Sequence, residues 1–362
     1  MLYWLLVPLR SDFFLFNVFR YITVRTAAAG ITALVLSFLL GPRIIRLLER
    51  KQIGQEIRAD GPKAHYAKKG TPSMGGLIII LCTIAPALLW GNLSNIYVWV
   101  AMLSMVLFGL VGLIDDVLKV RRRQSLGLRP GQKIVLQLGL AIIIGLVFMW
   151  MGSRGQFNLY LTFPFFKTWI PLLGWFYLPW IAFILVGSSN AVNLADGLDG
   201  LAIGLTLISA TALTALTYVA GHVNWSGYLN IAYVPPAAEL TVFAGAFAGA
   251  CLGFLWYNCH PAQVFMGDVG ALSLGGTLAV IALLIKQEFL LFTVAGVFIL
   301  EALSVLLQVS YFRLSGGKRI FKMAPLHHHF ELSGWPEERV VIRFWILGII
   351  FALFSLSTLK LR

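Results

Sequence analysis

Residues 96–119 read IYVWVAMLSMVLFGLVGLIDDVLK, and this stretch decides what kind of fold the chain adopts. Its first part, 96–114, carries no charge and is about as long as a helix that crosses the hydrocarbon core of a bilayer. The run then ends in two neighbouring carboxylates, Asp115 and Asp116, and Lys119 follows. The pattern predicts a transmembrane helix with a charged site at its end.

Similar apolar runs recur along all 362 residues. Hydrophobic residues make up 59% of the chain and charged residues 12%, roughly half the charged fraction of an ordinary soluble domain, so a soluble fold is excluded. We expect an all-α, polytopic integral membrane protein with about ten transmembrane helices. They are expected at about 22–40, 74–90, 96–114, 134–151, 171–189, 200–220, 238–257, 270–285, 289–309 and 344–359.

The distribution of charge predicts the orientation. The chain has 28 Lys and Arg against 15 Asp and Glu, a net charge of +13. Twenty of the basic residues lie in three segments that ten spans place on one side, namely 41–73, 115–133 and 310–343. Because positively charged loops stay in the cytoplasm, both termini are expected in the periplasm, and nucleic acid is not needed to explain the basic excess.

Two further patterns have ordinary explanations. The stretch from Arg43 to Lys51 is amphipathic at helical spacing, so it either extends the first helix or lies on the membrane surface. Cys82, Cys251 and Cys259 show no paired spacing, which argues against a disulfide framework or a zinc site.

The carboxylate pair at the end of the quoted stretch is unusual. If the helix continues, Lys119 lies one turn from both Asp115 and Asp116. A salt-bridged surface pair is the simpler explanation, but the dipole at a helix C-terminus disfavours anions. A bound divalent cation would stabilise both charges, and we favour that interpretation.

A second polar run, SSNAVNLADGLDG, covers residues 188–200. Asn190, Asn193, Asp196 and Asp199 recur in it at every third position. An Asx-rich turn would explain one or two of these residues. Four amide and carboxylate side chains favour a pocket for a polar ligand such as a sugar or a base.

A third run, NCHPAQVFMGDVG, covers 258–270 and places Asp268 at the start of an apolar span. An ordinary helix cap explains Asp268 equally well when it is considered alone. Since two other acidic clusters are expected on the same face, Asp268 becomes a candidate metal ligand.

Two basic motifs complete the set. His327, His328 and His329 suit phosphate binding or proton transfer rather than a transition metal, with a solvated loop as the alternative. The stretch KKGTPSMGG at 68–76 combines Lys68 with the start of a helix, which suits phosphate but is also how many helices simply begin.

Together these residues predict an activity. Carboxylates favour Mg²⁺, lysine and histidine favour anions, and phosphoryl transfer needs such charge neutralisation. The residues therefore indicate a Mg²⁺-dependent enzyme that joins a water-soluble phosphorylated compound to a lipid phosphate. A transporter of an anionic solute is the alternative from another class, although transporters usually carry charge near the midplane and show repeats, which we do not find here.

The same stretches carry a family resemblance that extends over nearly the whole chain. The chain resembles the polyprenyl-phosphate N-acetylhexosamine-1-phosphate transferases, and 325–335, PLHHHFELSGW, is similar to the muramoyl branch rather than the GlcNAc-1-phosphate branch. The other matching motifs are DGP at 60–62, KGTPSMGG at 69–76, DDVLK at 115–119, NAVNLADGLDG at 190–200 and PAQVFMGD at 261–268. Ser73 and Ala195 depart from a threonine in the family pattern.

The resemblance implies a reaction. UDP-MurNAc-pentapeptide and undecaprenyl phosphate would give lipid I and UMP with Mg²⁺, in the first membrane step of peptidoglycan synthesis. It also implies a homodimer in the inner membrane of a bacterium, with the active site on the cytoplasmic face. The alternative within the family is the sister enzyme that uses UDP-GlcNAc. Residues 1–362 would form a single transmembrane catalytic domain, with active-site loops around 41–73, 115–133, 188–200, 258–270 and 310–343.

The resemblance also implies residue roles. Asp268 would bind Mg²⁺, and Asp115 and Asp116 would lie at the metal and lipid-phosphate site, where one of them deprotonates the lipid phosphate. Phe265 would stack near the uracil. The residues expected to bind substrate are Lys68, Ser73, Lys119, Lys133, Asn190, Asn193, Asp196, Asp199, Asn258, Phe265, His327, His328 and His329.

Overall fold

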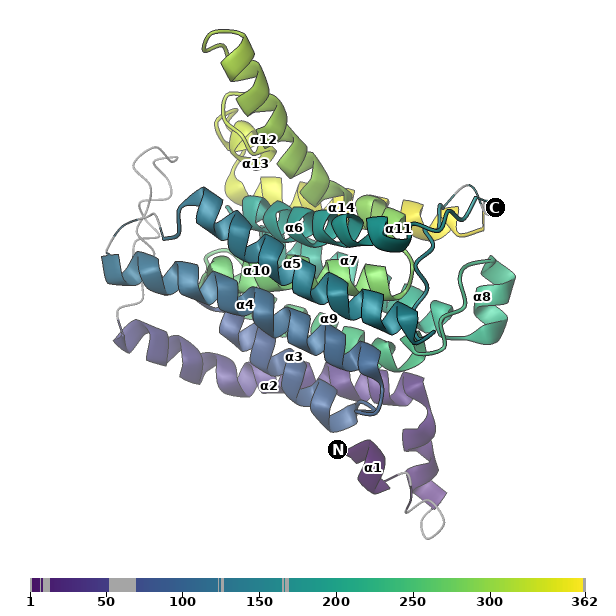
Figure 1. The fold of residues 1–362 in the computed structure, drawn as a ribbon. Coiled ribbons are helices and arrows are strands. Elements are labelled where there is room, and N and C mark those ends of the chain that lie inside the picture. The colour runs from purple at the N-terminus through teal and green to yellow at the C-terminus, as the bar shows by residue number, and fades with distance from the viewer. Residues whose placement is uncertain are drawn as a thin grey trace.

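The structure, a computed structural model, is a bundle of helices (Figure 1). It describes residues 2–6, 8, 14–51, 70–122, 124, 127–164, 166 and 169–360, and in these residues the only β pairing is one bridge between Tyr160 and Leu172. The long helices are α2 (Ile22–Arg50), α3 (Gly76–Trp90), α4 (Ile96–Arg122), α5 (Pro130–Ser153), α6 (Tyr177–Ala195), α7 (Leu201–Ala220), α9 (Ala237–Asn258), α10 (Gly267–Leu284), α12 (Gly296–Leu314) and α14 (Glu337–Thr358). The short helices are α1 (Leu2–Leu6), η2 (Phe14–Arg20), η4 (Gly174–Phe176), α8 (Val223–Leu229), α11 (Glu288–Val294) and α13 (Leu326–Glu331).

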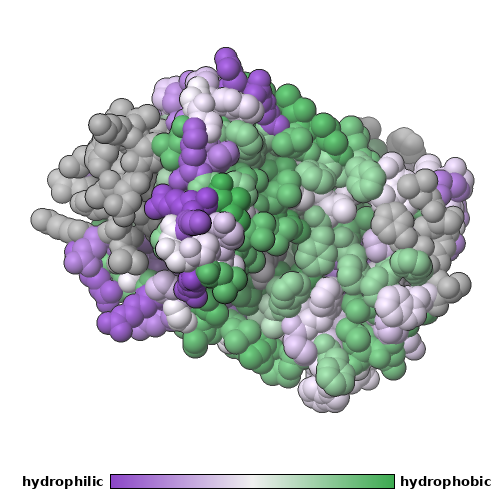
Figure 2. Space-filling view, turned by 90° about the horizontal axis from the view of Figure 1, so that it is seen from above, coloured by the Kyte–Doolittle hydropathy of each residue, from purple (hydrophilic) through white to green (hydrophobic). Residues whose placement is uncertain are grey.

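These helices confirm an all-α, polytopic membrane protein. Within the described residues, nine helices are long and apolar enough to cross a bilayer, and they include η4 and α6 as one span, Gly174–Ala195. The remaining expected span, 74–90, is the apolar helix α3, which is shorter, with 15 residues. Figure 2 shows an apolar belt across the molecule with hydrophilic side chains gathered toward one end, as expected for a protein surrounded by lipid.

The helix boundaries differ from the expected ones in two respects. The span expected over 289–309 is two helices, α11 and α12, which meet at Ala295. There the ring of Phe351 from α14 occupies the space beside Gly296, 2.8 Å from where a Cβ would lie. Helix α2 continues past its apolar part and ends at Arg50. Helix α14 begins at Glu337, well before its apolar part. The amphipathic stretch after residue 42 is therefore the end of α2, the first membrane span. Polar side chains at a helix end can reach the aqueous interface.

Helix α10 lies at the centre of the bundle. Every residue from Asp268 to Leu284 is buried, and α3, α4, α6 and α7 pack around it. Glycines allow this close approach: a Cβ at Gly112 of α4 would overlap the carbonyl oxygen of Asp268, and a Cβ at Gly76 of α3 would overlap Gly270. Small residues at such contacts are typical of helix packing in membranes. The packing holds the end of α4 against the start of α10.

Ion pairs at the opposite end of the bundle have a structural role. Arg25 of α2 forms two hydrogen bonds of 2.7 Å with Glu239 of α9. Lys286, which follows α10, is 3.0 Å from Glu288 and 2.7 Å from the hydroxyl of Tyr177. Arg25 and Lys286, both buried, are thus each paired with a carboxylate, as burial in a membrane requires.

Candidate active site

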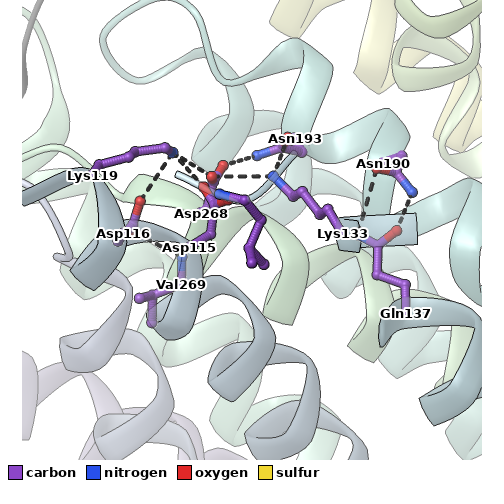
Figure 3. A network of polar contacts seen from close by, with 10 residues as sticks. Asp115, Asp116, Lys119, Lys133, Gln137, Asn190, Asn193, Asp268 and Val269 are labelled. Carbon is purple, nitrogen blue, oxygen red and sulfur yellow. Dashed lines mark hydrogen bonds and ion pairs between the residues drawn. The ribbon is translucent and has the colours of Figure 1, made fainter. Parts of the chain in front are cut away.

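Three carboxylates meet where α4 ends and α10 begins. Asp115, Asp116 and Asp268 each offer an oxygen, and these oxygens lie within 4.8 Å of one another. Lys119 lies among them, with its Nζ 2.7 Å from Asp115 and 3.3 Å from Asp116, and it also contacts Asp268 (Figure 3). In the structure α4 continues through the acidic pair to Arg122, which places Lys119 one turn away.

Helices α5 and α6 bring further polar side chains to this cluster. Lys133 of α5 is 3.1 Å from Asp268 and donates a hydrogen bond of 3.2 Å to Asn193, which itself donates to Asp268. One turn away, Asn190 donates to the side-chain oxygen of Gln137 at 2.6 Å (Figure 3). Sequence reasoning missed Gln137, although a polar residue inside an apolar helix was the available signal.

The charges in the cluster do not balance. Three carboxylates face two lysines, and two like charges about 4 Å apart repel by roughly 4 kcal/mol at an effective dielectric constant of about 20. Backbone groups stabilise part of this charge: Leu128 donates to Asp115 at 2.8 Å, and Val269 donates to Asp116 at 3.1 Å. The Lys119 ammonium lies among the carboxylates where a cation is most stable. Three carboxylates that offer only oxygen ligands are the kind of site that binds hard divalent cations.

The loop between α6 and α7 lies beside the carboxylates. Burial, together with the negative charges of Asp268, Asp116 and Asp199, raises the pKa of Asp196 to about 8. Asp196 directly follows α6, whose Asn193 donates a hydrogen bond to Asp268, so the loop begins beside the carboxylate cluster. The four polar residues of 188–200 are thus gathered at the same end of the bundle as the acidic pair.

Two residues expected to bind substrate also hold the loops together. Asn258 accepts from the Gly200 amide at 3.2 Å and donates to the carbonyl of Val264 at 2.9 Å. Asp199 accepts from the Ala262 amide at 3.1 Å and lies 3.3 Å from His260. His260 and Glu337, which sequence reasoning missed, form with Asp199 a second group of residues that could hold a metal ion.

The segment before α3 reaches the cluster through backbone pairing. Phe265 donates to the carbonyl of Pro72 and accepts from the amide of Gly75, each at 2.8 Å. Gly267 adopts a φ of +71°, and a Cβ there would lie 2.6 Å from Asp116 and 3.0 Å from the hydroxyl of Ser73. Ser73 is therefore next to the carboxylates. Lys68 lies outside the described residues.

The three histidines have different partners. His327 is fully buried, with Nδ1 3.1 Å from Glu301 of α12. His328 lies 2.8 Å from Glu331, and His329 accepts from the amide of Lys322 at 3.1 Å. The three side chains are thus held by three different parts of the chain. Glu301 was not predicted, although it is the one carboxylate in the apolar helix α12.

Known proteins are similar in sequence to this chain over its whole length. The chain matches the glycosyl transferase family 4 model over residues 98–286 and the phospho-N-acetylmuramoyl-pentapeptide-transferase signature 1 over residues 68–80. It is 52% identical to the phospho-N-acetylmuramoyl-pentapeptide-transferases of Koribacter versatilis, Desulfotalea psychrophila and Thermodesulfovibrio yellowstonii. Each of these matches covers 100% of both chains.

Proposed function

The chain belongs to the phospho-N-acetylmuramoyl-pentapeptide-transferase family, and we propose that it transfers phospho-MurNAc-pentapeptide from UDP-MurNAc-pentapeptide to undecaprenyl phosphate. The products are lipid I and UMP. The observation that carries this proposal is the cluster of Asp115, Asp116, Asp268 and two lysines at one end of a membrane-spanning bundle. Such a site can hold the phosphates of a soluble and a lipid substrate together.

Asp115, Asp116 and Asp268 would hold Mg²⁺, because their oxygens form a compact, hard donor set. When bound, the ion neutralises charge on the diphosphate. Asp115 or Asp116 removes the proton of the lipid phosphate, whose oxygen then attacks the sugar-bearing phosphorus. A new P–O bond forms to the lipid, the P–O bond to UMP breaks, and UMP leaves. Lys119 and Lys133 stabilise the negative charge of the phosphates.

The nucleotide sugar would bind across the loops beside this cluster. We assign its pocket to Ser73, Asn190, Asn193, Asp196, Asp199 and Asn258, with Phe265 stacking near the uracil. Amides and carboxylates can satisfy the donors and acceptors of a sugar and a base. His328, His329 and Lys68 contact phosphate or sugar. The buried His327 forms part of the pocket wall, against Gly197.

An apolar groove between α5 and α6 supports a lipid substrate. It is lined by Leu138, Ile142, Leu178, Pro179, Ala182, Phe183, Val186 and Gly187. One end of the groove lies next to Gln137 and one turn from Asn190, so a prenyl chain in it would place its phosphate near the carboxylates. We further propose that the site faces the cytoplasm of a bacterial inner membrane, where the basic segments lie, and that the protein is a homodimer.

The test is product analysis with purified protein. UMP and lipid I should appear only when UDP-MurNAc-pentapeptide, undecaprenyl phosphate and Mg²⁺ are all present, and a chelator should stop the reaction. UDP-GlcNAc in place of the muramoyl substrate serves as the control and should give no product. Turnover of UDP-GlcNAc alone, or transport in liposomes without turnover, would refute the proposal.

A further inference from the structure

Glu301 is a buried carboxylate in the apolar helix α12. Both of its oxygens face His327: Oε1 accepts from the backbone amide at 3.2 Å, and Oε2 lies 3.1 Å from ring nitrogen Nδ1. An ionisable side chain in such a helix is expensive and usually serves a function. Here the two contacts fix both the backbone and the ring orientation of His327.

The other ring nitrogen, Nε2, points at the loop between α6 and α7. A Cβ at Gly197 would overlap Nε2, so the ring lies directly against the loop backbone. Nε2 is buried and has no hydrogen-bond partner in the described part of the chain. The contact between Glu301 and Nδ1 thus holds the ring against the loop although Nε2 gains no hydrogen bond there, and an unpartnered buried nitrogen destabilises a fold.

The loop that the ring supports belongs to the proposed nucleotide-sugar pocket. Asp196 and Asp199 flank Gly197, and α6, with Asn193, leads directly into the loop. On its other side, Asp199 is held through its amide, which donates to Glu337 at 2.8 Å. A shift of the His327 ring would therefore move Asp196 and Asp199 relative to the carboxylate cluster.

We propose that Glu301 is a positioning residue: it fixes the His327 ring against Gly197 and so holds the α6–α7 loop in the conformation that accepts the nucleotide sugar. The inference rests on the proposed function, since it assigns a support to that pocket. Glu301 itself contacts no substrate in this scheme. Its effect should appear in nucleotide-sugar binding and leave binding of the lipid substrate unchanged.

Glu301→Gln tests the carboxylate. A glutamine amide places an NH2 donor opposite one of the two N–H groups of His327, where two donors cannot pair, so the amide or the ring must turn, or the ring must move its proton to the other nitrogen. We expect the KM for UDP-MurNAc-pentapeptide to rise about tenfold, with kcat and the KM for undecaprenyl phosphate within about twofold of wild type. Gly197→Ala displaces the same ring from the loop side and should raise the same KM by a similar factor.

The double variant separates positioning from general damage. If both changes act through one ring, their effects overlap, and the double variant should show about the tenfold rise of one variant rather than about a hundredfold. Gly139→Ala on α5, where a Cβ has open space, is the matched control and should behave as wild type. If Glu301→Gln fails to fold, the KM of Gly197→Ala for UDP-MurNAc-pentapeptide still tests whether the position of the His327 ring controls nucleotide-sugar binding.

The outcomes distinguish this inference from the proposed function. A wild-type KM in either folded variant, an equal rise for both substrates, or additive effects in the double variant would overturn the role of Glu301. None of these results affects the proposed reaction. Absence of wild-type turnover, in contrast, refutes the proposed function before any variant is compared.

Discussion

Asp268→Asn should abolish turnover while leaving the protein folded. The amide keeps the shape of the side chain but removes one of three negative charges in a cluster whose oxygens lie within 4.8 Å of one another. A unit charge about 4 Å from a divalent ion contributes roughly 8 kcal/mol at an effective dielectric constant of about 20. Desolvation offsets part of this, and even half of it, ~4 kcal/mol, corresponds to a loss of about a thousandfold in rate.

The same substitution should change stability little, because both lysines keep partners. Lys119 retains Asp115 at 2.7 Å and Asp116 at 3.3 Å, and Lys133 retains Asn193 at 3.2 Å. The repulsion among the carboxylates also decreases. We expect the free energy of unfolding to change by less than about 2 kcal/mol.

Glu288→Gln is the matched control, because it also removes a buried carboxylate beside a lysine. Glu288 contacts Tyr177, which lies 16 residues before Asn193 on α6, about 24 Å along the helix at about 1.5 Å per residue. This variant should lose about 3 kcal/mol of stability and keep its activity. UMP release and thermal unfolding in detergent measure the two effects. Turnover by Asp268→Asn above one tenth of wild type would refute the electrostatic reasoning.

Three further predictions concern the same end of the bundle. Lys119→Met should lower the unfolding temperature in chelator, because the carboxylates lose their cation, and added Mg²⁺ should restore it; equal melting temperatures with and without Mg²⁺ would contradict this. Between pH 4 and 8 the folded protein keeps a proton on Asp196, whose pKa is about 8, whereas the unfolded chain releases it near 3.8. The free energy of unfolding without metal should therefore fall as pH rises through this range. Thermal melts at several pH values should show a shallower fall for Asp196→Asn than for wild type. If the variant's stability falls with pH as steeply as that of the wild type, the pKa of Asp196 is not raised. Gly112→Ala should push α4 away from the Asp268 carbonyl, destabilise the protein by about 1–3 kcal/mol and reduce UMP release, and near-normal activity would mean that the spacing of these helices is not critical.

Most of the architecture could be predicted from hydrophobicity, because lipid requires every spanning segment to satisfy its own backbone hydrogen bonds. The span at 96–114 is an example, whereas hydrophobicity left open whether its helix continues to Lys119, as it does in the structure. The break at Ala295 could not be predicted, because both sides of it are equally apolar and the ring of Phe351 beside Gly296 comes from a distant helix.

The sequence was sufficient to identify the residue types of the site, since carboxylates and amides at the ends of apolar helices are expensive there and stand out. The residue types alone could not show which of them meet, although the family resemblance implies one metal site for Asp115, Asp116 and Asp268. Only packing around α10 brings Asp268 to Asp115, although 153 positions separate them, because glycines at the helix contacts let the backbones approach. Packing alone also turns His327 inward onto Glu301, a pairing between helices that no local pattern along the chain encodes.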